Sequence, residues 1–247
     1  MKTRERVVEY HRNLAMLWSV SPNDLQVKWS HDHPTVFNNI EVRSQWCFSL
    51  RDEAARRILA GTLARSQSVH AQIEDPAIHH LHAIIASRID HRELGVFWAL
   101  HQNASVDIEN WKQLLDGDEA QDFLTALEAL PEETSLRIDS QVVEKGVWSG
   151  WKLEDWQQTV EKLRNGNTSW IQMGLWVQRE EAIAMDGTMQ ESLEVLCKAI
   201  GDIHRMIQWS EDQDRLELQQ AIEEEKKARK EDRKKEEARQ EGRQQEV

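Results

Sequence analysis

The densest cluster of side chains suited to chemistry in this sequence is the segment HHLH at 79–82. The dipeptide Asp75-Pro76 ahead of it is typical of a helix start, because Asp caps free amides and proline fits the first turn. On that helix His79 and His82 would share one face, with Asp75 a turn earlier. Imidazole and carboxylate groups are common zinc ligands, so His79 and His82 are the candidate metal ligands.

No catalytic motif completes this histidine segment. The chain has no HExxH or ExxH pattern, no glycine-rich phosphate loop of the GxGxxG or GxxxxGK[ST] type, and no GxSxG nucleophile elbow. The two cysteines, Cys47 and Cys197, are far apart, which favours buried free thiols in a reducing compartment. We therefore expect a noncatalytic protein without a cofactor. The alternative is a metal-dependent hydrolase or nuclease that uses the His cluster.

Tryptophan is the dominant aromatic residue, with 11 copies against four phenylalanines and one tyrosine. Most tryptophans fall on apolar faces with helical spacing and are expected in the core. These are Trp18, Trp98, Trp111, Trp156 and Trp170. Trp148 and Trp151 differ, because the glycines at 146 and 150 predict a connecting loop over 148–151. Exposed loop aromatics mark recognition surfaces, so we interpret these two as partner-binding residues.

A heptad pattern predicts the clearest helix of the sequence, over residues 189–207. Thr188 and Glu191 form a capping box ahead of it. Apolar residues then follow at a spacing of four and three, as in a coiled coil. They are Met189, Leu193, Leu196, Ile200, Ile203 and Ile207. This stripe must pack against a partner, either inside the fold or on another chain, and Leu193, Leu196, Ile200 and Ile203 are our candidate contacts.

The remaining pattern favours a mainly α, all-helical protein, because only four prolines and ten glycines interrupt it. We expect a multi-helix bundle or irregular helical array over 1–210, with a small β-hairpin or sheet at 24–50. A charged extension, helical or disordered, occupies 211–247. The segments IENWKQ and LEDWQQ lie 45 residues apart, which fits the period of helical-pair repeats, but no third copy follows.

Charge and hydropathy restrict the partners. The chain carries 44 acidic and 31 basic residues, a net charge of −13, which disfavours nucleic acid. The longest strongly apolar run, LGVFWAL at 94–100, is too short to span a bilayer, so we expect no membrane contact and a cytoplasmic location. The preferred function is a helical adaptor or assembly subunit that binds other proteins or self-associates through helix 189–207 and the 148–151 loop.

One segment resembles a known family. KGVWSGWKLEDW, followed by VEKLRNGNTSWIQMG, is similar to the start of a Myb/SANT repeat, in which a Trp before acidic residues opens the first helix. The resemblance covers roughly 30 residues and implies that the later segment TMQESLEVLCKAIG would act as the reading helix. That segment has one lysine and two glutamates, so the resemblance implies an acidic module that binds basic protein tails rather than DNA.

Overall fold

The structure is a computed structural model, and it describes residues 9–14, 25–29, 44–51, 55–56, 58–59, 78–139, 141–184, 187–210, 212 and 214–217. The chain divides into two compact units, Met1–Trp209 and Ser210–Val247. Most of the second unit, including the predicted charged tail, lies outside the described residues, as does Trp18. Within the described part of the chain, no helix has the length and apolar character needed to cross a membrane.

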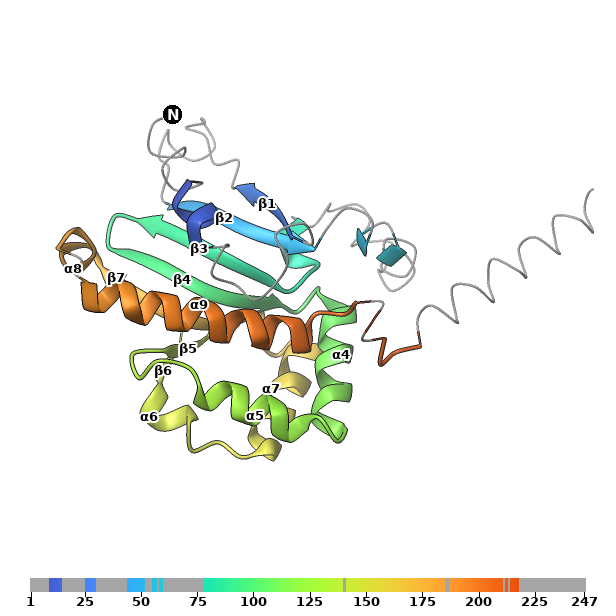
Figure 1. The fold of residues 1–247 in the computed structure, drawn as a ribbon. Helices are drawn as coiled ribbons and strands as arrows, with labels where there is room; N and C mark the ends of the chain where they lie inside the picture. The colour runs from blue at the N-terminus through green and yellow to red at the C-terminus, as the bar shows by residue number, and fades with distance from the viewer. Residues whose placement is uncertain are drawn as a thin grey trace, which may run out of the picture. The chain divides into compact units, whose positions relative to one another are not determined.

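The centre of the first unit is a seven-stranded sheet in which all neighbouring strands are antiparallel (Figure 1). The order is β1-β2-β3-β4-β7-β5-β6, so β7 inserts between β4 and the β5-β6 hairpin. The strands are β1 (Leu25–Trp29), β2 (Ser44–Arg51), β3 (Ile84–Asp90), β4 (Glu93–His101), β5 (Ser135–Ile138), β6 (Gln141–Glu144) and β7 (Trp170–Gln178).

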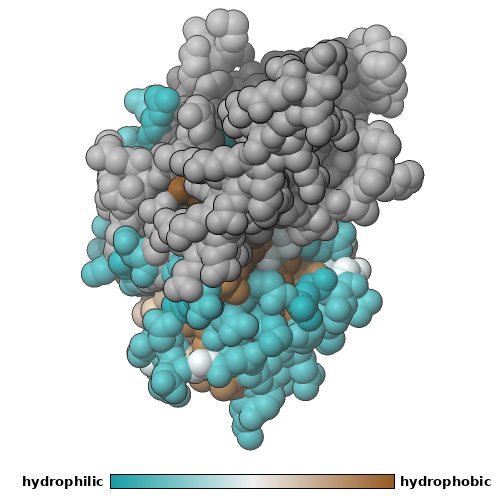
Figure 2. Space-filling model, turned by 90° about the vertical axis from the view of Figure 1, so that its right-hand side faces the viewer, coloured by the Kyte–Doolittle hydropathy of each residue, from teal (hydrophilic) through white to brown (hydrophobic). Residues whose placement is uncertain are grey.

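Helices cover one face of this sheet. These are α4 (Ser105–Asp116), α5 (Ala120–Glu128), α6 (Lys145–Trp148), α7 (Leu153–Arg164), α8 (Arg179–Ile183) and α9 (Gly187–Ile207). The short helix η2 (Ile78–His80) lies on the opposite face, where His79 packs on Phe48. The long helix α9 runs along the sheet, and it contacts β3, β4 and β7 as well as α4 and α5 (Figure 1). The described surface in Figure 2 is mostly hydrophilic, with apolar groups confined to small areas.

Both faces of the central strands are buried. On the helix side lie Ile85, Val96, Trp98, Leu100, Leu136, Ile171, Met173, Leu175 and Val177. The opposite face carries a second apolar cluster of Phe48, Leu50, Ile84, Ala86, Phe97 and Ala99, against which Trp46, Trp170 and Trp176 pack. Strands buried on both sides form uninterrupted apolar runs, because neither set of alternating positions needs to be polar.

The prediction of a mainly α, all-helical bundle is therefore wrong, since most of the sheet lies outside the predicted β segment. The run LGVFWAL, whose Trp98 was expected on the apolar face of a helix, is the centre of β4. Its helical spacing was accidental, because a short apolar run fits a buried strand equally well. The segment from Trp170 to Val177 is likewise part of strand β7 rather than a helix. The residues from Ile84 onward form a strand as well, β3.

Other elements match the sequence patterns. The heptad pattern forms α9, and the 24–50 segment contains β1 and β2, although these belong to the large sheet. IENWKQ and LEDWQQ lie in α4 and α7, which pack on each other with Trp111 and Trp156 in contact, their ring centroids 6.2 Å apart. Because strands β5 and β6 separate them along the chain, the two helices are not successive repeats of a helical array.

Candidate functional site

The structure places Trp148 in the core. It belongs to the short helix α6, and its side chain is 1% exposed, with its ring centroid 6.3 Å from that of Trp156. Of the predicted loop over 148–151, Trp148 is the last residue of α6 and points inward, while residues 149–151 form the connection to α7. Trp148 is not available to a partner while the fold is intact.

The heptad stripe of α9 is also internal. Leu193, Leu196, Ile200 and Ile203 are all buried in the core beneath the sheet, together with residues of α4 and α5. These side chains pack against their own fold, so they form no free coiled-coil surface. The sequence left open whether this stripe packs inside the fold or against another chain, and in the structure it packs inside the fold.

His79 and His82 do not share a helical face, because η2 ends at His80 and β3 begins at Ile84. The His79 ring packs among aromatic side chains, 5.1 Å from the Phe48 ring and stacked at 6.2 Å on Trp170. His82 is buried near Arg51 and Asp107 instead. Among the described residues, no group of three or more His, Cys, Asp or Glu side chains is arranged to hold a metal ion.

The environment of His82 is a buried polar network. Arg51 forms an ion pair with Asp107 and donates a hydrogen bond of 3.0 Å to the carbonyl of Trp209. The Asp107 carboxylate also accepts the amides of Ala83 and Trp209, at 2.7 and 2.9 Å. Burial raises the pKa of Asp107, but the Arg51 guanidinium, the His82 imidazole and the amides of Ala83 and Trp209 together outweigh it and hold that pKa below its usual value. This buried network connects the end of β2, the residues just before β3, the first turn of α4 and the residues just after α9.

A second histidine cluster lies on the other face of the sheet. The rings of His80 and His101 stack with centroids 4.2 Å apart, and both contact Trp170. Burial lowers the pKa of His79 and His101 to about 4, and it also lowers that of His80. At neutral pH these imidazoles are uncharged, and they behave as part of the aromatic packing against β4 and β7.

An open groove in the described part of the chain contains Trp151. Its volume is about 610 Å³, and it lies between the β5-β6 hairpin, α7 and the turn before β7. The lining residues are Ile138, Asp139, Gln141, Val143, Trp151, Asp155, Gln158, Thr159, Lys162, Asn167 and Thr168. Trp151 is half-buried, and its ring packs edge-on against Trp156 at 5.0 Å. We call this cavity the Trp151 groove, and it retains one of the two tryptophans that the sequence indicated for binding.

Local structure fixes the two carboxylates of the groove. Asp139 has a positive φ of 52°, as required in the two-residue connection between β5 and β6, and its Oδ1 accepts the amides of Ser169 and Trp170, both at 2.9 Å. Asp155 accepts the amide of Lys152 at 2.8 Å, which caps the start of α7. Both side chains are exposed, and both line the groove.

One wall of the groove is the last strand of the sheet. β6 pairs with β5 alone among the described strands, and its side chains are mainly exposed. Val142 on β6 is 58% exposed and Val147 on α6 is 61% exposed. Only four large apolar side chains of the described residues are exposed, and these two are close together in the chain. The strand edge therefore combines open backbone groups with apolar surface.

Sequence reasoning missed this edge. The segment LRIDSQVV contains two short apolar runs around a two-residue Asp-Ser connection, which is a hairpin signal. The signal is weak because each strand has only four residues.

Comparison with known proteins assigns no family. No protein-family model matches the chain, and no curated protein is significantly similar to it. The segment that resembles a Myb/SANT start folds as α6, α7 and β7, so its later tryptophan, Trp170, lies on a strand.

Proposed function

We propose that this protein is a noncatalytic binding protein that contacts another protein through β6 and the adjoining Trp151 groove. The observation that carries the proposal is the terminal position of β6, whose Val142 is exposed and whose Gln141 and Val143 line the groove. An edge strand presents unpaired N–H and C=O groups, which pair readily with another chain unless charged side chains protect it. Here the two central residues of the strand are valines.

The groove supports the same proposal. Its volume falls in the range of about 300–1,000 Å³ typical of specific ligand sites. Tryptophan is enriched among residues that dominate binding energy, because it buries a large area with few rotatable bonds. Trp151 is the one aromatic residue of the groove, and it is held in place by Trp156. A rigid aromatic side chain in a concave site next to a strand edge is a suitable anchor for a protein partner.

Site-specific photo-crosslinking in cells tests the proposal. A photoreactive amino acid replaces Val142 in the full chain, and a matched chain carries it at Val195, which is 51% exposed on α9. We expect a discrete crosslinked protein from position 142 and none from position 195. Trp151→Ala in the first chain should reduce the crosslink several-fold. Equal products from both positions would show that this surface does not bind a partner. A product at 142 that is insensitive to Trp151→Ala would show that the Trp151 groove is not part of the interface.

A further inference from the structure

We propose that the partner element is an extended, positively charged peptide segment that adds to β6 as an eighth strand and places a Lys or Arg side chain in the Trp151 groove. This inference rests on the proposed function and specifies the chemistry of the partner.

The backbone of β6 determines how the segment would bind. In an antiparallel ladder, alternate residues direct their N–H and C=O groups to one neighbour and the remaining residues direct theirs to the other. The β5 strand uses the inward half, with Leu136 opposite Val143 and Arg137 opposite Val142. The outward half points away from the sheet. An extended peptide supplies matching groups along its length, as in other cases of strand addition.

The side chains of β6 determine where those of the partner would point. Gln141 and Val143 line the groove, while Val142 and Glu144 alternate to the other face. An added strand follows the same alternation, because paired strands share their pleat. Every second side chain of the bound segment would therefore project on the groove side of the sheet, towards Trp151.

The groove is chemically suited to a cation. It offers the carboxylates of Asp139 and Asp155, the indole of Trp151, and the amide oxygens of Gln158 and Asn167. A guanidinium or ammonium group forms its strongest hydrogen bonds with carboxylates, and it is attracted to the face of an indole ring. Because backbone amides already hold both carboxylates in position, little ordering would accompany binding.

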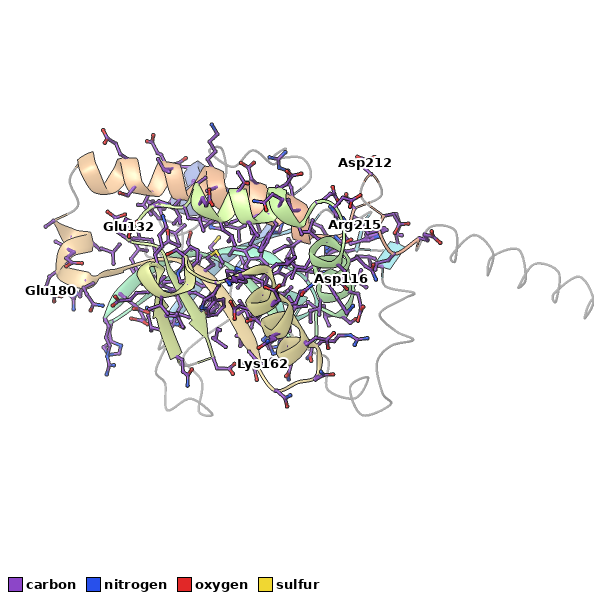
Figure 3. All side chains as sticks on the ribbon, turned by 90° about the horizontal axis from the view of Figure 1, so that it is seen from below. Asp116, Glu132, Lys162, Glu180, Asp212 and Arg215 are labelled. Carbon is purple, nitrogen blue, oxygen red and sulfur yellow. The ribbon has the colours of Figure 1, made fainter. Side chains whose placement is uncertain are left out.

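Charges around the groove agree with this chemistry. Glu144 and Glu154, the sequence neighbours of the lining residues Val143 and Asp155, are exposed, and the whole chain has a net charge of −13. Lys162 is the one basic residue of the lining, and it lies exposed on α7 (Figure 3). A basic segment is attracted to this region at long range, whereas an acidic one is repelled. A second copy of the chain fits less well, since antiparallel pairing of two β6 strands would place Gln141 opposite Glu144 and supply no cation.

Binding of defined peptides to the full-length protein tests the inference. The probe is a fluorescein-labelled eight-residue peptide that alternates valine and lysine, and the control replaces each lysine with glutamate. We expect the lysine peptide to bind at least tenfold more tightly by fluorescence anisotropy, and to protect the β6 amides from hydrogen exchange. A lysine peptide with a central proline, which cannot complete the ladder, should bind several-fold more weakly.

Variants locate the site. Asp139→Asn with Asp155→Asn removes two charges but retains the oxygens that accept backbone amides, and Asn tolerates the positive φ at 139. This double variant should lose at least tenfold in affinity for the lysine peptide. Asp122→Asn, which removes an exposed charge on α5, should leave affinity unchanged.

Each contrary outcome has a definite meaning. Equal affinity for the lysine and glutamate peptides would overturn the charge assignment, and binding without protection of β6 would overturn strand addition. Dimerisation in light scattering that protects β6 without any peptide would make a second copy the occupant. If neither peptide binds while Val142 still crosslinks a protein, this inference fails and the proposed function stands. If the crosslink is also absent, the proposed function fails as well.

Discussion

Arg51 and Asp107 form an ion pair in the interior of the protein, where their side chains are 3% and 1% exposed. The pair joins the end of β2 to the first turn of α4, and Asp107 also binds the amides of Ala83 and Trp209. The residues are 56 positions apart in the sequence. Their contact shows that a charged group can be part of the core when a counterion and hydrogen-bond partners lie beside it.

Removal of one member of this pair should be strongly destabilising. Asp107→Ala leaves the Arg51 guanidinium buried without its counterion and deprives two amides of their acceptor. We expect the free energy of unfolding to fall by about 3–5 kcal/mol in urea denaturation. Asp116→Ala removes the partner of Lys112 in an exposed pair on the same helix, and should cost less than about 1 kcal/mol. Similar losses for the two variants would contradict the structural role of Asp107.

The stability of the fold should decrease in mild acid. Burial lowers the pKa of His204 and of His82 to about 4, and that of His11 to about 3. The Asp107 carboxylate raises the pKa values of His204 and His82, and the Arg51 guanidinium lowers them, but burial has the largest effect on both. Between the unfolded value of 6.5 and about 4, the unfolded chain binds protons that the folded chain excludes. The contribution of these imidazoles to stability is therefore complete above pH 6.5. The free energy of unfolding declines below that pH, by on the order of 1–3 kcal/mol for each imidazole.

Urea midpoints at pH 7.5 and pH 5 measure this effect. His204→Gln should reduce the difference between the two midpoints, because it removes one buried proton-binding group, whatever its effect on stability itself. His91→Gln provides the control, since His91 is exposed in the β3-β4 turn. An unchanged pH dependence in the His204 variant would mean that this imidazole does not titrate as its burial requires.

Gly174 permits the close approach of the paired strands β4 and β7. A Cβ at this position would overlap the carbonyl oxygen of Val96 and the Cβ of Phe97, and the contact includes backbone that cannot move independently. Gly174→Ala should therefore lower stability by about 1–3 kcal/mol, the cost of overpacking, in thermal or urea unfolding. Gly146→Ala is the matched control, because nothing lies within 4 Å of its Cβ position. Its stability should equal or slightly exceed that of the parent protein, as alanine favours helix α6.

Trp148 and Trp151 should respond differently to truncation. Trp148→Ala opens a large cavity among Trp156 and its neighbours, and should cost about 3–5 kcal/mol in free energy of unfolding. Trp151→Ala removes a half-buried ring and should cost less, while it weakens binding of the lysine peptide at least fivefold. Comparing the loss of peptide affinity with the loss in free energy of unfolding, variant by variant, separates the core role of Trp148 from the groove role of Trp151. A Trp148 variant that is as stable as the parent would disprove its place in the core.

Local patterns in the sequence were sufficient for the elements whose signals are long or have caps. The heptad spacing and capping box predicted α9, and the helical spacing around Trp111 agrees with α4. His11 and Leu14 are buried in a helical segment, where His11 hydrogen-bonds Ser49 and Ser87. These patterns succeed because the hydrogen bonds and the side-chain period of a helix lie within one continuous segment of the chain.

Tertiary structure alone decided the sheet and the surface that we propose for binding. Strand β7 pairs with β4, whose partner residues lie 69 to 85 positions earlier, and burial on both faces removes the alternation by which a strand is recognised. The same reason separates Trp148 from Trp151, since which ring is enclosed depends on α7 and the core around Trp156. Composition and local spacing determined which residues are apolar, whereas long-range pairing determined which of them remained at the surface beside β6.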